Sequence, residues 1–221
     1  MNRLKYTLLT DGSSDKTLMN IIHWSLTDIY PQLPCDGNYA DLRQLKTPPP
    51  AGHVTQRIFE ARKLYPFDIL FYHRDAETFD KHIIQKRKEE IMEHVDVRLA
   101  PKIVCVVPVT MMETWLLIDS YAIKKAAGNR NFSEAIELPQ LSRLESVRDT
   151  KLLLHQALII TSGLKGRRKK SFNVQMAVHH VADFIEDYSP LRELSAFNEF
   201  ECDLIKAVDL HLVSNRNEMQ K

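Results

Sequence analysis

The chain has 221 residues, and 44% of them are hydrophobic, which is enough to bury the core of one large domain or of a medium domain with an appendage. Its 30 basic and 29 acidic side chains nearly balance, so bulk charge does not indicate a nucleic-acid-binding protein, and such a role needs a local basic patch. The three cysteines are widely spaced and form no CxxC pair, which argues against a disulfide scaffold or a zinc site and favours a reducing compartment.

The N-terminal residues lead straight into a predicted strand, with no apolar signal segment before it. No apolar run in the sequence approaches the length that a membrane span needs. We therefore expect a cytoplasmic protein without a membrane partner.

An apolar run at residues 6–9 predicts the first strand. It ends in a turn where Asp11 and Asp15 flank Gly12, and a segment with helical periodicity follows, carrying Leu18 on its apolar face. The order is strand, turn and helix, with acids at the carboxyl end of the strand, where ligand sites of open α/β sheets lie.

Residues 30–38 and 45–52 are rich in turn-forming side chains and predict turns and a stiff loop. Residues 54–64 then repeat apolar side chains at helical spacing, and Pro66 closes that predicted helix.

Residues 67–72 form a compact apolar run, as expected of a strand that is covered on both faces. Asp75 and Glu77 follow this strand directly. A charged amphipathic helix is predicted next, roughly at residues 79–94, and its expected apolar side consists of Ile83, Ile84, Ile91 and Met92.

Residues 102–107 predict another buried strand, and a further helix is expected from Thr110 to Asp119, with Glu113 near its start. Up to about residue 125 the chain therefore alternates strand and helix, which predicts an α/β fold with a mostly parallel sheet.

The pattern changes after Gly128. Helical patterns occupy residues 148–161, 173–187 and 196–212, and only residues 158–161 are ambiguous between helix and strand. We therefore predict an α/β domain at residues 1–128, followed by a helical C-terminal region at residues 129–221.

Acids follow each of the three predicted strands. Since parallel strands end at one edge of a sheet, we expect these acids to converge, and clustered carboxylates suit a hard cation such as Mg²⁺ or Mn²⁺. Each acid also has a simpler explanation. Glu113 lies three residues after Thr110, as in a capping box, Asp15 can complement a helix dipole, and Asp75 and Glu77 can belong to an ordinary polar loop.

The segments around these acids resemble a known domain family. Residues 9–16, Leu-Thr-Asp-Gly-Ser-Ser-Asp-Lys, are similar to the E-G-x-x-D opening of the Toprim domain, and residues 71–77 resemble its second motif, an acid pair with one residue between. Residues 107–119 are similar to the P-V-x-x-x-E-x-W-L-L-x-D segment of a bacterial Toprim-like family (the DUF4276 type). Toprim domains occur in topoisomerases, primases and OLD nucleases. Where the Toprim pattern has Glu and Asp-x-Asp, this chain has Asp11 and Asp75-x-Glu77.

The resemblance implies a Toprim-like fold and a Mg²⁺- or Mn²⁺-dependent nuclease that hydrolyses phosphodiesters of DNA or RNA. It implies a role in bacterial antiphage defence with an ATPase partner protein. The expected catalytic residues are Asp11, Asp75, Glu77 and Glu113, and Asp15 joins them as an expected metal ligand. The sequence leaves open a homo-oligomer, a catalytically silent binding or regulatory subunit, and a small-molecule phosphatase.

Residues 165–170 contain five cations in six positions. The simpler interpretation is a solvated loop between helices. The functional one is a nucleic-acid-binding strip, because contacts to backbone phosphates supply most of the nonspecific affinity. The expected contacts are Lys165, Arg167, Arg168, Lys169 and Lys170.

Overall fold

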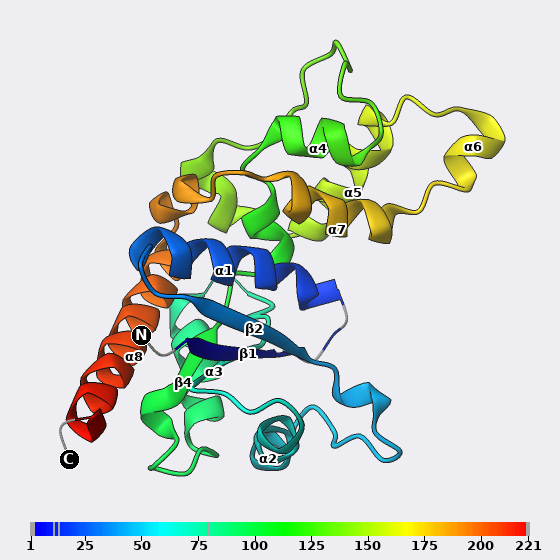
Figure 1. Ribbon diagram of the computed structural model, residues 1–221. Coiled ribbons are helices and arrows are strands. Elements are labelled where there is room, and N and C mark those ends of the chain that lie inside the picture. The colour runs from blue at the N-terminus through cyan, green and yellow to red at the C-terminus, as the bar shows by residue number, and fades with distance from the viewer. Residues whose placement is uncertain (1–2, 11, 13, 79, 220–221) are drawn as a thin grey trace.

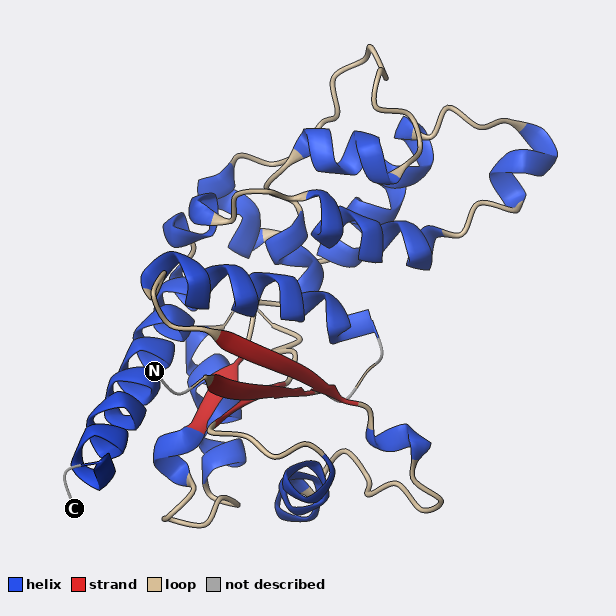
Figure 2. Cartoon of the chain, in the orientation of Figure 1, coloured by secondary structure: helices blue, strands red, loops and turns tan. Residues whose placement is uncertain are grey.

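A computed structural model describes residues 3–10, 12, 14–78 and 80–219. Its centre is a four-stranded, all-parallel sheet in the order β2-β1-β3-β4, with helices around it, so the α/β fold is confirmed (Figures 1 and 2). The strands are β1 (Leu4–Leu9), β2 (Cys35–Ala40), β3 (Ile69–His73) and β4 (Ile103–Val106). The helices are α1 (Leu18–Ile29), α2 (Val54–Leu64), α3 (Lys81–Met92), α4 (Ser120–Ala126), α5 (Thr150–Thr161), α6 (Gly166–Lys170), α7 (Val174–Phe184) and α8 (Ser195–Met219).

Helices cover the sheet on both faces. On one face, Tyr6 of β1 stacks on His23 of α1, and Phe71 of β3 packs against Phe200 of α8. On the other face, the Thr7 hydroxyl donates to the carbonyl of Tyr65 at the end of α2. Figure 1 shows α1 and α2 on opposite sides of the strands. The sheet is therefore buried on both faces, as parallel sheets usually are.

The strand order reverses between β1 and β3. The chain leaves β1 to form β2 on one side, and later adds β3 and β4 on the other side. In open α/β sheets, ligands bind at the carboxyl ends of the strands beside such a switch point. The loops after β1 and β3 are therefore the first place to look for a site.

The interpretation of residues 30–38 as turns alone was wrong, because β2 begins at Cys35. Its partner along the whole length is β1, and much of its surface is exposed, so it lacks the apolar run that marked the other strands. Gly37 lies opposite Tyr6, and the tyrosine ring occupies the space that a Cβ at Gly37 would need. A glycine in an edge strand thus marks a close approach between side chain and backbone.

Replacing Gly37 by Ala should lower the free energy of unfolding by about 1–3 kcal/mol, because the new methyl group forces the Tyr6 ring to move within a packed core. Urea unfolding measures the change. Gly52→Ala is the matched control, since a Cβ at Gly52 would meet no neighbouring side chain or backbone within 4 Å. Equal effects of the two substitutions would show that Tyr6 does not require glycine beneath it.

The helices agree with the pattern at residues 54–64 and with the C-terminal patterns, and residues 158–161 belong to α5. In α3, Ile84 and Ile91 are buried as expected, whereas Ile83 is exposed. The helix expected from Thr110 is instead a short 3-10 helix at Met112–Leu116, and α4 begins only after Asp119, whose carboxylate caps it. No helix in the described part of the chain is long and apolar enough to cross a membrane.

The C-terminal helices pack directly on the α/β core. α7 lies against α1, and α4 and α5 lie against α7. α8 returns to the sheet at β4, where Phe197 and Phe200 contact Trp115. The division at residue 128 stays a prediction about domains, since packing is continuous across it.

Candidate functional site

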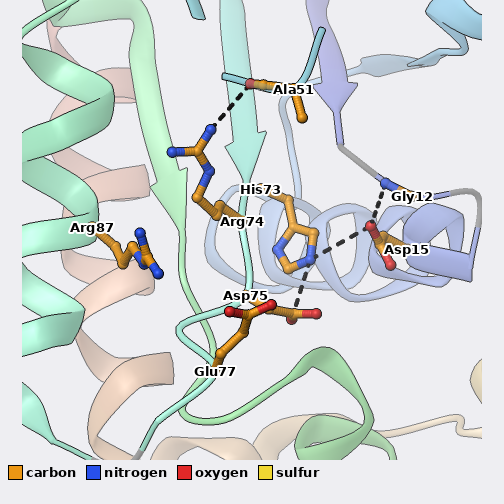
Figure 3. A pocket seen from close by; sticks show the side chains of 8 residues that line it. All are labelled: Gly12, Asp15, Ala51, His73, Arg74, Asp75, Glu77 and Arg87. Carbon is orange, nitrogen blue, oxygen red and sulfur yellow. Dashed lines mark hydrogen bonds and ion pairs between the residues drawn. The ribbon is translucent and has the colours of Figure 1, made fainter. Parts of the chain in front are cut away.

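A pocket of about 530 Å³ lies at the carboxyl ends of β1 and β3. It is therefore beside the switch point of the sheet. Figure 3 shows Asp15 on its right, the two arginines on its left, and His73 between them. Its lining residues are Gly12, Asp15, Ala51, His73, Arg74, Asp75, Glu77 and Arg87.

Asp15 reaches the pocket from a short 3-10 helix, Ser14–Thr17, that precedes α1. Its Oδ2 accepts a hydrogen bond from the backbone N–H of Gly12 at 3.0 Å and lies 3.7 Å from Nε2 of His73. An interaction with the helix dipole therefore does not fully explain Asp15, because its largely buried carboxylate points toward His73.

Asp75 is held in place from the loop that follows β4. Its Oδ1 accepts a hydrogen bond from the backbone N–H of Met112 at 2.9 Å and lies 3.4 Å from Nε2 of His73. The Thr17 hydroxyl also donates to Sδ of Met112. The loops after β1, β3 and β4 thus meet around Met112.

His73 is the last residue of β3 and is almost fully buried, with 1% of its surface exposed. Its Nδ1 lies 2.9 Å from the carbonyl oxygen of Val106, which can only accept a hydrogen bond. Burial lowers the pKa of His73, but the hydrogen bond and charge of Asp75 and the charge of Asp15 outweigh burial, so the pKa is raised. The imidazole therefore lies between two carboxylates, with its Nε2 close to an oxygen of each.

Glu77 has a left-handed backbone conformation, with φ of 57°, and Thr110 opposite it has φ of 58°. The Glu77 N–H donates to the Thr110 carbonyl at 2.7 Å, and the Thr110 N–H donates to the Thr78 carbonyl at 2.9 Å. These two bonds join the loops after β3 and β4. Left-handed non-glycine residues are rare and concentrate at functional sites.

Replacing Glu77 by Gly should raise the free energy of unfolding by about 1 kcal/mol, because glycine adopts positive φ without strain. The matched control is Glu93→Gly, since Glu93 has φ of −57° and should lose stability on the same change. Urea unfolding of both variants decides the point. If both substitutions lower the free energy of unfolding, the left-handed backbone of Glu77 is not strained enough for glycine to relieve it.

Glu113 does not line the pocket, although the charges of Asp75 and Asp15 act on it. Its side chain is 5% exposed, and Lys151 Nζ is 3.6 Å from its Oε1. Burial raises the pKa of Glu113, and the charges of Asp75 and Asp15 add to that rise against the opposing effect of Lys151. The capping-box interpretation does not hold, because the 3-10 helix has no side-chain cap and the Thr110 hydroxyl instead lies 3.1 Å from that of Thr114.

The structure thus places four of the five predicted acids at the carboxyl edge of β1, β3 and β4: Asp15, Asp75, Glu77 and Glu113. Asp11 lies outside the described residues. The basic strip is exposed throughout, and its residues 166–170 form the short helix α6 rather than a loop. Figure 1 shows α6 projecting at the right of the view, the direction in which β1 and β2 also run.

Three pocket residues with basic side chains were not predicted from the sequence. His73 could have been predicted, because it ends a buried strand and lies on the same face of that strand as Phe71, two residues earlier. No sequence pattern places Arg74 and Arg87 at the pocket. Arg74 is turned by its hydrogen bond to the Ala51 carbonyl, and Arg87 comes from α3, so only the tertiary fold brings both to the pocket.

The donor set suits a hard divalent cation. Mg²⁺ is usually held by one or two carboxylates together with waters and substrate phosphates, and Asp15 and Asp75 supply such carboxylates. Within residues 3–10, 12, 14–78 and 80–219, no three His, Cys, Asp or Glu side chains form a complete metal-binding group as they stand. A cation at this pocket therefore depends on a few protein ligands supplemented by water or substrate.

Comparisons with protein-family models, with curated proteins and with solved structures found no match. The Toprim resemblance therefore stays a prediction that rests on the motifs of this chain.

Proposed function

We propose that the protein is a Toprim-like, Mg²⁺- or Mn²⁺-dependent nuclease. The observation that carries this proposal is the gathering of acids from the loops after β1 and β3 at the switch point of a parallel sheet, with arginines on the opposite side of the pocket. Acids can hold a cation, and arginines can bind the phosphoryl oxygens of a substrate.

Asp15, Asp75 and Glu77 would hold the cation, which supplies charge stabilisation at phosphoryl oxygens and an activated water when bound. The chain's own residues then position the substrate. Arg74 and Arg87 line the pocket and present guanidinium groups that match phosphate geometry. Met112 N–H fixes one oxygen of Asp75, so that carboxylate is oriented before any ligand arrives.

Glu113 would act on the site indirectly, through the electrostatic interaction of its carboxylate with Asp15 and Asp75. Asp11 completes the proposed catalytic set on the strength of the motif resemblance alone. The same resemblance supports a defence role with an ATPase partner.

The test is a cleavage panel. Purified protein, with and without any ATPase that a neighbouring gene encodes, is incubated with plasmid, single-stranded DNA and tRNA in Mg²⁺ or Mn²⁺. We expect cleavage of at least one nucleic acid, abolished by chelation. Cleavage of p-nitrophenyl phosphate alone would favour a small-molecule phosphatase. Tight binding of the ATPase without cleavage of any substrate would favour a regulatory subunit.

The basic strip at residues 165–170 should bind nucleic acid through phosphates. Replacing Arg167 and Arg168 by Ala should flatten the slope of log affinity against log salt by about 1.8 on duplex DNA, or about 1.4 on single strands. Stability should hardly change, because both side chains are exposed. Fluorescence anisotropy across a salt series measures the slope.

The matched control for the strip replaces Arg62 and Lys63, an exposed basic pair in the last turn of α2. An unchanged slope in the Arg167/Arg168 variant would assign the strip to a solvated surface or to a protein partner.

A further inference from the structure

His73 presents one ring nitrogen to the pocket in a fixed orientation. Because the Val106 carbonyl only accepts, Nδ1 must carry a hydrogen and donate it. Nε2 is therefore the atom that faces Asp15 and Asp75, whether it carries a proton or a lone pair. Metal-binding histidines are oriented in this way, with the second ring nitrogen donating to a backbone carbonyl or a carboxylate.

Two distances from Nε2 suit a shared ion, although the three side chains do not form a complete metal-binding group without one. Nε2 lies 3.4 Å from Oδ1 of Asp75 and 3.7 Å from Oδ2 of Asp15. Ligand atoms that each lie roughly 2.1 Å from one ion are typically about 3–4 Å apart. His73 cannot move away easily, since it is 1% exposed and ends a central strand.

We propose that His73 Nε2 is a metal ligand together with Asp15 and Asp75, and that this pocket takes a first-row transition-metal dication such as Mn²⁺ in preference to Mg²⁺. The proposal rests on the proposed metal site and adds the identity of the metal. Mg²⁺ favours oxygen ligands, whereas imidazole nitrogen suits first-row transition metals.

The competing explanation is that His73 is a permanent counterion to two carboxylates. The two explanations differ in what a bound metal contacts. As a ligand, His73 places a nitrogen on the ion. As a counterion, it leaves an all-oxygen coordination shell, and its positive charge opposes any cation.

The experiment detects that nitrogen directly. Mn²⁺ bound to the full-length wild-type protein is measured by electron spin echo envelope modulation, first with natural-abundance protein and then with ¹⁵N-histidine. We expect ¹⁴N modulation that the label converts to ¹⁵N modulation, and a Mn²⁺ affinity by calorimetry that exceeds the Mg²⁺ affinity.

His73→Gln then assigns the signal. It should abolish the nitrogen modulation and weaken Mn²⁺ binding at least about tenfold, while Mg²⁺ binding changes little because Mg²⁺ favours oxygen ligands. His180→Gln, an exposed histidine on α7, is the control and should keep the signal. The wild-type labelling result stands even if His73→Gln does not fold.

Mn²⁺ binding that is lost in Asp75→Asn but shows no histidine modulation in the wild type would overturn the His73 assignment and leave the proposed metal site intact. Absence of any Mn²⁺ binding by the wild type would overturn both.

Discussion

Replacing Asp75 by Asn should reduce nucleic-acid cleavage about a thousandfold while the protein stays folded. A metal ion contributes several kcal/mol of charge stabilisation, and about 4 kcal/mol corresponds to roughly three factors of ten in rate. Asn keeps the shape of the side chain, and its carbonyl oxygen can still accept the hydrogen bond from Met112 N–H. The substitution therefore removes the charge and leaves the local structure in place.

The measurement is the cleavage rate at saturating Mn²⁺ on the substrate that the panel identifies, together with Mn²⁺ affinity by calorimetry. Asp36→Asn is the matched control, because Asp36 is an exposed aspartate on β2, away from the pocket. Wild-type cleavage by the Asp75 variant would remove this residue from the site, and equal losses in both variants would point to a general effect of charge.

The sequence predicted β1, β3 and β4 because the chemistry of a strand that is covered on both faces is visible in a short window. Every residue of β3 is buried, and so is every residue of β4, so both appear as unbroken apolar runs. β2 does not, since most of its residues are exposed or partly exposed and Gly37 lies under the Tyr6 ring. β4 is also an edge strand, but α8 covers it and all its residues are buried. β2 is defined by its pairing with β1, and a local sequence pattern does not contain that neighbour.

The same reasoning explains what could be predicted of the site. The acids could be placed after strands, and parallel strands share one edge, so their convergence followed from topology. The side chains and loops that each acid contacts did not follow from topology. The pairing of His73 with Asp15 and Asp75 joins segments far apart in sequence, and the left-handed conformation of Glu77 depends on its bonds to the loop after β4.

The C-terminal region also has a role that its helical pattern did not reveal. α8 places Phe200 against Phe71 of β3, with ring centroids 6.1 Å apart, and against Trp115 at 5.8 Å. Phe71 is two residues before His73 on the same face of the strand. The helix thus supports the strand that carries the pocket, although it comes nearly last in the chain.

Phe200→Ala should lower the free energy of unfolding by about 3–5 kcal/mol, because it removes a buried ring and leaves a cavity between α8 and the sheet. That loss is a large part of the roughly 5–15 kcal/mol that stabilises a typical domain. Urea unfolding followed by tryptophan fluorescence measures it, since Trp115 adjoins the cavity.

The matched control is Leu210→Ala on the same helix, where the side chain is 54% exposed and the expected change is within about 0.5 kcal/mol. A small effect at Phe200 would mean that α8 contributes little to the α/β core, and residues 1–128 should then fold without it. A large effect means that the core includes α8, and that a fragment ending at residue 128 loses cooperative unfolding because the face of β3 and β4 beneath Phe200 is left in water.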